Sequence, residues 1–210
     1  MTRARQEILG RVRAALADRP SAPEPKWVYG APVSTGDHDV VERFIERAAD
    51  YRATVVRVDA DAVGSAVAEA LSAVRATSVV GDALVQSRWG AGDGVTWISE
   101  DGLDARQLDG VDAVVTTATV AIANTGTIVL DHGPGQGRRA LSLIPDVHVC
   151  VVESGQIVTD VPEAVSRLVD IGSHTRPLTW ISGPSATSDI ELDRVEGVHG
   201  PRTLYVIVAG

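Results

Sequence analysis

The sequence predicts an α/β fold in which helices cover a mostly parallel sheet. Hydrophobic residues make up 44% of the 210 positions and aromatic residues only 4%, so Val, Ala, Leu and Ile must fill the core. Such a composition suits buried parallel strands with helices on both faces. Short apolar runs also alternate with helical segments along the chain, which is the pattern of βαβ units. The length indicates one large domain, or one domain with an appendage.

The first segment of the chain is expected to form a helix that is detached from the main body. Thr2 can cap a helix running to about Asp18. An apolar residue recurs every four positions along this helix, at Ile8, Val12 and Leu16. This narrow stripe needs a partner, which could be the body or another subunit. Residues 19–37 contain four prolines and two glycines and are predicted to be a linker, so we divide the chain into 1–37 and a domain at 38–210.

Helices and strands are then expected to alternate through the domain. The pattern predicts helices at 39–50, 62–74 and 162–170, the last one capped by Asp160 or Val161. It predicts strands at 53–58, 78–80, 95–98, 113–116, 126–130, 147–152, 178–181 and 204–208. The region 126–152 has successive strands without helices between them, and this favours an antiparallel part there. The run at 204–208 is apolar throughout and is expected to be a buried final strand.

Charge and residue usage exclude several classes of function. A formal charge of −9 disfavours a general nucleic-acid or acidic-membrane surface, which would need a basic face. The single cysteine, Cys150, cannot supply a multi-cysteine zinc or iron-sulfur site. The only lysine, Lys26, follows no glycine-rich phosphate loop. The histidines have no metal-binding spacing, and no run of apolar residues is long enough for a signal sequence or a membrane span. We therefore expect a cytoplasmic protein with no metal or cofactor of its own and no membrane insertion.

One polar segment that could bind a ligand follows the strand at 113–116. Small hydroxyl residues at the carboxyl end of a strand are well placed for a ligand, and Thr125, Gly126 and Thr127 could approach an anion closely. Arg138 could hold a carboxylate or a phosphate with two hydrogen bonds. The glycine-rich stretch 133–137 is expected to be a flexible lid or a hairpin tip. The alternative is structural, because threonines favour strands, glycines favour turns and a surface arginine is often only solvated.

A second polar segment lies just before the final strand. Ser188 and Glu191 have the spacing of a capping box, so Ser188 is expected to begin a short helix. The amides and hydroxyls at such a helix start could bind an anion. The predicted ligands here are Ser185, Thr187, Ser188 and, as an anion clamp, Arg202. His199 is the candidate acid/base residue, although a histidine in a turn is often only structural or exposed.

The two polar segments together resemble the LUD-domain family. The resemblance rests on 119–130 with Ala123-Asn124-Thr125-Gly126-Thr127, on 138–145 with His148, and on 183–191 with 197–202, and it covers most of the chain after the linker. It implies a fold similar to the sugar-phosphate isomerase and CoA-transferase-like proteins. It also implies that the chain acts with two iron-sulfur partner proteins in oxidising L-lactate to pyruvate. Family members often carry an acidic residue where this sequence has Asn124.

The leading hypothesis from the sequence is an accessory or substrate-handling component of such a lactate-oxidising system. This chain would be the component without a cluster, and a small carboxylate or phosphate would bind between 125–127, 185–188 and Arg202. One alternative is a stand-alone enzyme that acts on a phosphorylated or CoA-linked small molecule. The other is an assembly module that binds its partners through the first helix.

Overall fold

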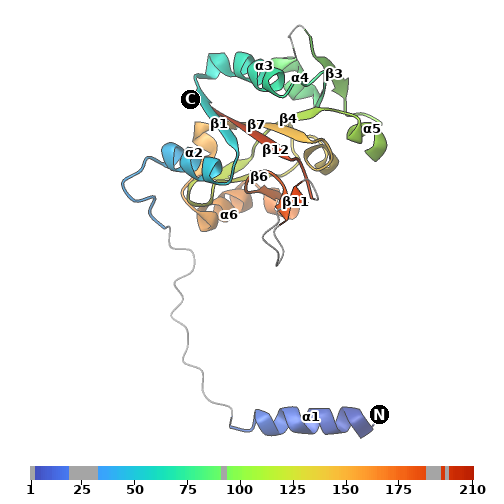
Figure 1. The fold of residues 1–210 in the computed structure, drawn as a ribbon. Coiled ribbons are helices and arrows are strands. Elements are labelled where there is room, and N and C mark those ends of the chain that lie inside the picture. The colour runs from blue at the N-terminus through green and yellow to red at the C-terminus, as the bar shows by residue number, and fades with distance from the viewer. Residues whose placement is uncertain (1–2, 19–32, 91–93, 188–194, 197–198) are drawn as a thin grey trace.

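The fold contains the predicted parallel sheet. The computed structural model describes residues 3–18, 33–90, 94–187, 195–196 and 199–210 (Figure 1). Six strands lie in the order β1-β12-β7-β4-β2-β3, and every neighbouring pair is parallel. Their bounds are β1 Thr54–Val58, β12 Thr203–Ala209, β7 Val147–Glu153, β4 Ala113–Thr117, β2 Ser78–Gly81 and β3 Thr96–Ser99. The α/β prediction is confirmed, and the last strand of the chain lies inside the sheet.

Helices cover both faces of this sheet, as the composition predicted. On one face α2 (Val40–Asp50) packs Phe44 and Ala48 against alternate residues of β7 and β12. On the other face α3 (Val63–Ala73) and α4 (Ala83–Trp89) pack against the remaining residues of these strands. A further short helix, α5 (Ala105–Asp109), buries Leu108 beside β2 and β4. The sequence pattern missed α4 and α5 because five to seven residues are too few to show helical periodicity.

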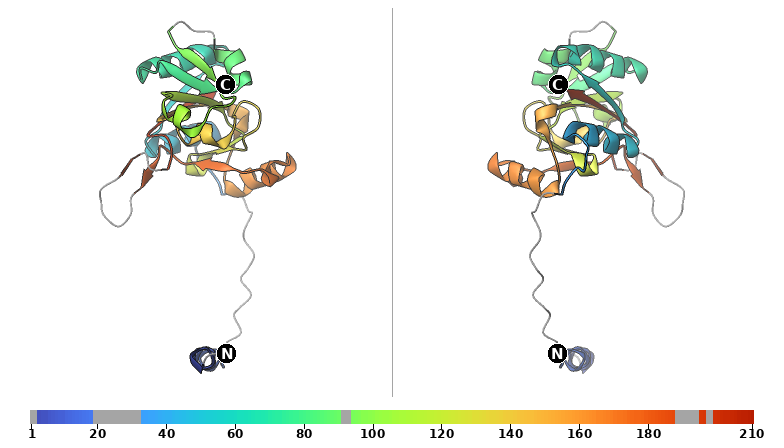
Figure 2. Two further views of the ribbon diagram at one scale, coloured as in Figure 1. Left: turned by 90° about the vertical axis from the view of Figure 1, so that its right-hand side faces the viewer. Right: turned by 90° about the vertical axis from the view of Figure 1, so that its left-hand side faces the viewer.

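A smaller sheet extends the body beyond the parallel one. Its order is β8-β5-β6-β9, with bounds Ile157–Val158, Val120–Ile122, Thr127–Leu130 and Thr179–Ile181. The pairs β5-β6 and β6-β9 are antiparallel, whereas β5 and β8 run parallel. Helix α6 (Val161–Asp170) covers one face of this sheet with Ala164 and Leu168, and its N-cap is Asp160. Figure 2 shows α6, in orange, on the outside of the body.

One part of the predicted antiparallel region is wrong. The strand expected at 147–152 does not join the antiparallel sheet, because β7 pairs in parallel with both β4 and β12. Its residues from His148 to Val152 are all buried, which is the pattern of a central parallel strand. The connection from β6 to β7 contains only the short 3-10 helix η3 (Arg139–Ser142), so the sequence gives no helical crossover to reveal the parallel pairing.

The helix predicted to begin at Ser188 falls outside the described residues. On either side of that gap, β10 (Ala186–Thr187) and β11 (Val195–Glu196) pair with each other in an antiparallel ladder. The polar C-terminal segment is thus carried by a two-stranded hairpin where the structure describes it. The neighbouring residues 183–185 and 199–202 enter and leave this hairpin.

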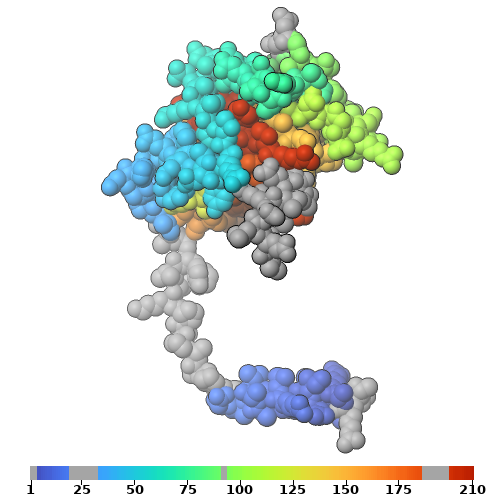
Figure 3. Space-filling view, viewed as in Figure 1, coloured from blue at the N-terminus to red at the C-terminus, as the bar shows by residue number. Residues whose placement is uncertain are grey.

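The detached N-terminal helix is also confirmed. Helix α1 (Arg3–Ala15) lies apart from the body in Figures 1 and 3. The chain has rejoined the body by Val33, whose amide donates to Asp160 Oδ2 at 2.5 Å and whose carbonyl accepts from Asn124 Nδ2 at 3.0 Å. The domain boundary at residue 38 stays a prediction. Among the described residues, no helix combines the length and the apolar character needed to cross a membrane.

Gly126 fixes the contact between the smaller sheet and α2. It follows the 3-10 helix η2 (Ala123–Thr125) with a positive φ of 60°, which favours glycine. A Cβ atom at this position would lie 2.6 Å from the backbone nitrogen of Ala48 and 2.6 Å from the carbonyl carbon of Arg47. Both neighbours are helix backbone and cannot move aside as a flexible side chain could.

Gly126→Ala should therefore lower the free energy of unfolding by about 2–4 kcal/mol, from the positive φ and the clash together. Urea unfolding measures this change. Gly102→Ala is the matched control, since Gly102 has a φ of 76° with no heavy atom within 4 Å of the added Cβ. It should cost only about 1 kcal/mol. Equal losses in the two variants would show that α2 does not constrain Gly126.

Candidate functional site

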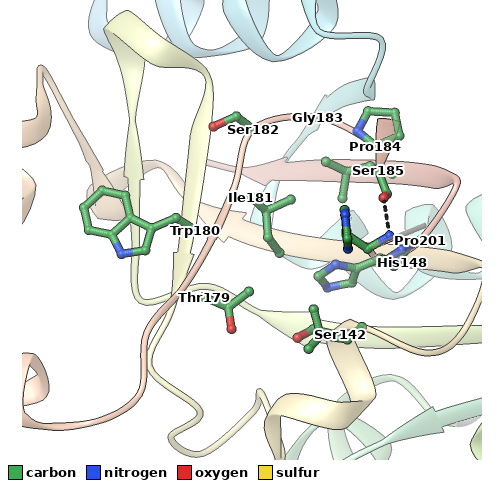
Figure 4. Close-up of a pocket in the computed structure, with 14 residues that line it drawn as sticks. Ser142, His148, Thr179, Trp180, Ile181, Ser182, Gly183, Pro184, Ser185 and Pro201 are labelled. Atoms are coloured by element: carbon green, nitrogen blue, oxygen red, sulfur yellow. Dashed lines mark hydrogen bonds between the residues drawn. The ribbon is translucent and has the colours of Figure 1, made fainter. Parts of the chain in front are cut away.

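A pocket of about 270 Å³ lies where the amino ends of β7 and β12 meet β9 and the base of the β10-β11 hairpin (Figure 4). It combines hydroxyl groups, two histidines and apolar side chains, which is a typical lining for a small polar ligand. The lining residues are Ser142, Leu143, His148, Thr179, Trp180, Ile181, Ser182, Gly183, Pro184, Ser185, His199, Gly200, Pro201 and Leu204. The indole of Trp180 points away from the other lining residues (Figure 4).

Two hydrogen bonds join the segments that enter and leave the hairpin. The Ser185 amide donates to the Pro201 carbonyl at 2.8 Å, and the His199 amide donates to Ser185 Oγ at 3.1 Å. Because Ser185 Oγ accepts this bond, its own proton remains available to donate to a ligand. The structure thus brings Ser185 and His199, both predicted from the sequence, to the same wall of one pocket.

His148 is the most unusual polar group of the pocket. It lies on β7 with only 1% of its surface exposed. Its Nε2 atom is 2.7 Å from Thr116 Oγ1 on the neighbouring strand β4, whereas Nδ1 has no hydrogen-bond partner among the described residues. Burial lowers the pKa of His148 to about 4, so the ring is neutral at pH 7. A buried nitrogen without a partner is costly, and a bound ligand would relieve that cost.

The hydrogen bonds behind His148 determine what its free nitrogen can do. Thr116 Oγ1 donates to Cys150 Sγ at 3.6 Å, and burial raises the pKa of this thiol to about 12. With the Thr116 proton placed on the sulfur, Thr116 accepts the Nε2 proton of His148. The other ring nitrogen, Nδ1, then carries a lone pair. His148 thus lines the pocket, and its buried Nδ1 atom is an acceptor without a partner among the described residues.

The Thr-Gly-Thr segment touches the pocket only through an intermediate side chain. Thr127 Oγ1 is 2.8 Å from Ser182 Oγ and 2.8 Å from Thr125 Oγ1, so a chain of hydroxyls runs from the pocket wall to Thr125. The space beside Gly126 is filled by α2. Asn124 donates to the Val33 carbonyl, a bond that an ionised acidic side chain at this position could not make.

The other predicted ligands lie elsewhere or outside the description. The Arg138 guanidinium donates to the Leu103 carbonyl and its amide donates to Glu100 Oε2 at 3.1 Å, at the opposite edge of the parallel sheet. The side chain of Arg202 is 59% exposed, and its Nε lies 3.5 Å from Asp146 Oδ1. Thr187 belongs to β10, and Ser188 lies outside the described residues. Arg138 and Arg202, which the structure describes, do not line the pocket.

The carboxyl edge of the sheet is closed by the glycine-rich loop, which corrects the prediction of a flexible lid. The strand order reverses between β2 and β4, where open α/β sheets usually bind ligands. Here the Gly135 amide donates to the Asp82 carboxylate and its carbonyl accepts from the Thr117 amide at 2.7 Å. A Cβ at Gly135 would lie 2.5 Å from Thr117 Oγ1. The loop is packed into the switch point and is not a free lid.

A second buried polar cluster surrounds Asp131 but satisfies itself. Burial alone would raise the pKa of Asp131. Hydrogen bonds from Ser173, Thr119 and the Gly133 amide, together with the nearby Arg176 guanidinium, outweigh burial and lower that pKa. Because these bonds are made within the chain, the cluster holds the loop in place. Among the described residues, no group of three or more His, Cys, Asp or Glu side chains is arranged to hold a metal ion.

Comparison with known proteins identifies the family. The family model for the LUD domain matches residues 41–209. The chain belongs to the LUD-domain family. It is 45% identical to lactate utilization protein C of Deinococcus radiodurans over 207 residues, which are 99% of this chain and 96% of that protein. Lactate utilization protein C of Bacillus pumilus is 41% identical over 86 residues, 39% of this chain and 35% of that one.

A solved structure supports the same assignment. The crystal structure of a DUF162 family protein from Deinococcus radiodurans matches with a TM-score of 0.71 and 41% sequence identity, over 85% of this chain and all of that one. The family resemblance recognised in the sequence is therefore confirmed. The more specific similarity to sugar-phosphate isomerase and CoA-transferase-like proteins stays a prediction.

His148 was not among the site residues predicted from the sequence. It contributed to the family resemblance and was otherwise treated as a histidine without metal-binding spacing. The available signal was its place in the apolar run Val147–Glu153, because a histidine inside a buried strand needs hydrogen-bond partners. Ser142 and Thr179 carried no comparable signal, since they reach the pocket only through the fold.

The buried His148 should make stability depend on pH. The unfolded chain binds a proton at this residue below about pH 6.5, whereas the folded chain does not until about pH 4. Acidification therefore favours the unfolded state. This contribution to the free energy of unfolding begins to fall near pH 6.5 and is lost by about pH 4, a total of about 3 kcal/mol.

His148→Phe should remove this part of the pH dependence. Urea unfolding at pH 7 and pH 5 should show a difference between the two pH values that is smaller by about 2 kcal/mol in the variant. His174→Phe, at an exposed histidine of the 3-10 helix η5 (Ser173–Thr175), is the control and should keep the original pH dependence. An unchanged pH dependence in His148→Phe would contradict the neutral buried ring.

Proposed function

We propose that this chain is the substrate-handling component of a multi-protein system that oxidises L-lactate to pyruvate. It binds the acid in the pocket of Figure 4, and iron-sulfur clusters in partner proteins accept the two electrons. The name of the Deinococcus radiodurans relative supports a role in lactate utilization. The single cysteine of the chain supports the placement of the clusters in the partners.

The observation that carries the proposal is the free Nδ1 of His148. A buried acceptor in a pocket selects a ligand that can donate a hydrogen bond. The 2-hydroxyl group of lactate is such a donor, whereas the keto oxygen of pyruvate is not. A hydroxy acid would satisfy His148, and its oxidised product would leave Nδ1 unpaired again, which favours release of the product.

The opposite wall supplies groups for the carboxylate of the same ligand. The Ser185 hydroxyl has a proton to donate, and the His199 imidazole lies at the same wall. Figure 4 shows the Ser185 hydroxyl and the His148 ring on neighbouring sides of the pocket. In this proposal Thr125 and Thr127 do not contact the ligand; they orient Ser182, which lines the pocket.

The volume of this pocket favours a small acid over a larger substrate at this site, while pockets of about 390–440 Å³ lie elsewhere on the chain. Sites for drug-sized ligands typically measure about 300–1,000 Å³, and this pocket of about 270 Å³ is below that range. The volume suits a three-carbon acid better than a CoA thioester. The packed loop at the carboxyl edge also leaves no open phosphate-binding crevice at the strand reversal.

Ligand discrimination tests the proposed pose. Isothermal titration should show that L-lactate binds at least about tenfold more tightly than pyruvate or propionate, because only lactate can donate to Nδ1. Equal affinities for the three acids would contradict the pose. A response to CoA or sugar phosphates alone would favour the stand-alone enzyme instead.

Two variants test separately the proposed contacts of the hydroxyl group and of the carboxylate of the ligand. His148→Phe should weaken L-lactate binding about tenfold and leave propionate binding unchanged, since propionate makes no bond to Nδ1. Ser185→Ala should weaken all three acids by a similar factor, because each has the carboxylate. His174→Phe should leave every affinity as it is. The proposed pose would be excluded if His148→Phe weakened lactate and propionate equally.

The division of labour is tested by activity. The purified chain should give no lactate-dependent dye reduction alone, and activity should appear when the iron-sulfur partner proteins are added. His148→Phe should reduce that reconstituted activity. Full activity of the isolated chain would overturn the substrate-handling role, even if lactate binds in the pocket.

A further inference from the structure

Helix α1 exposes an apolar stripe that has no partner among the described residues. Its members Ile8, Val12 and Leu16 recur at every fourth position and are 61%, 48% and 61% exposed. Leu16 continues the helical pattern, since its amide donates to the Val12 carbonyl at 3.1 Å. We call these three residues the α1 stripe.

A helix of this length needs such a partner to be stable. Isolated helices shorter than about 12–15 residues are marginal in water, and α1 has 13 residues with a glycine in the middle. The ion pair between Arg11 and Glu7, at 2.7 Å, is fully on the surface and adds little. Burial of the α1 stripe is the main stabilisation that the sequence of α1 makes available.

Helix α6 exposes a stripe with the same spacing on the body. Its inner face buries Ala164 and Leu168, while Val161, Val165 and Val169, along one side of that face, are 40%, 44% and 48% exposed. Valine is unfavourable at a solvent-facing helix position, because its side chain is apolar and its helix propensity is low. We call these three valines the α6 stripe. Trp180 pairs with Val129, which faces α6, so the exposed indole extends this apolar surface.

The chain connects the two stripes over a short distance. Residues 16–32 join α1 to Val33, and the Val33 amide is bonded to Asp160, the N-cap of α6. A flexible chain of this length has a root-mean-square span of about 20–25 Å, and a proline-rich one can extend further. Each stripe is about 12 Å long. Helix α1 can therefore reach α6 of the same molecule, at an effective concentration in the millimolar range, about that of other short tethers.

Charge also favours contact between the first helix and the body. Helix α1 contains four arginines and one glutamate and therefore has a formal charge of +3. Because the whole chain has a formal charge of −9, the rest of the chain carries −12. The exposed residues of α6 include Glu163 and Asp170, while Arg167 is half-buried. The basic helix is thus complementary to the net negative charge of the body.

We propose that α1 docks onto α6 of the same molecule, with the α1 stripe packed against the α6 stripe. Three observations favour α1 as the helix that covers the α6 stripe: the short connection through residues 16–32, the equal spacing of the two stripes and the opposite charges of α1 and the body. The docked helix covers the α6 stripe, and its own stripe is buried without a second chain.

Disulfide trapping in the full-length chain tests the contact. Val12 and Val165 are the central members of the two stripes, so Val12→Cys with Val165→Cys places the sulfurs together for either helix direction. Native Cys150 is buried with a pKa near 12 and does not compete. The matched control combines Ala14→Cys with Val165→Cys, because position 14 is about 200° around the helix from position 12.

The expected result is an intramolecular disulfide that forms at least about tenfold faster in the Val12 pair than in the Ala14 pair, at a rate independent of protein concentration. Predominant disulfide-linked dimers would mean that a second copy occupies α6 and would overturn the proposal. Equal rates in the two pairs, or no disulfide in either, would also overturn it.

Hydrogen exchange gives a second reading without new cysteines. The amides of residues 8–16 should be protected in the native chain, and Val165→Asp should reduce that protection about tenfold. Val165→Thr keeps the size of the side chain without a charge and should have a smaller effect. Protection that is absent from the native chain, or unchanged by Val165→Asp, would contradict docking on α6.

Discussion

The structure depends on the pairing of the last strand with the middle of the sheet. Strand β12 lies between β1 and β7, and its register sets Leu204 beside His148. Without β12, strand β1 would have no partner in the sheet and α2 would lose part of the surface on which it packs. The same strand holds 199–202, at one wall of the pocket, against the body. The end of the chain therefore completes both the core and the candidate site.

The pocket owes its character to a polar chain buried between β4 and β7. Thr116 is hydrogen-bonded to both His148 and Cys150 inside an otherwise apolar layer, and burial keeps both the imidazole and the thiol neutral. Each bond in this chain fixes the direction of the next proton. The result is a lone pair at a defined place, and it costs no buried charge. This arrangement gives the small cavity one directional polar contact without the free-energy cost of a buried charge.

Much of the fold could be predicted because its signals are local. The β-branched runs predicted β1 and β12, and the caps Asp39 and Asp160 mark the starts of α2 and α6. The parallel pairing of β7 could not be predicted in this way, since no helical crossover precedes it. For the site, Ser185 and His199 were found from their turn-rich segment. Thr125 and Thr127 were placed in the pocket itself, whereas the structure connects them to it through Ser182.

The placement of the pocket at the amino ends of the strands follows from the loop that fills the other edge. A parallel sheet with a strand reversal offers a crevice at its carboxyl edge. Here the Gly135 amide donates to the Asp82 carboxylate and the Thr117 amide donates to the Gly135 carbonyl, and these bonds close it. The buried Asp131 cluster then fixes the loop, so the crevice cannot open without breaking several bonds at once. At the amino edge the chain instead leaves an acceptor on His148 without a partner. At the carboxyl edge, where ligands usually bind, the polar groups of the loop are hydrogen-bonded within the chain. At the amino edge His148 Nδ1 has no partner within the described part of the chain, so a ligand bound there could supply the missing hydrogen bond.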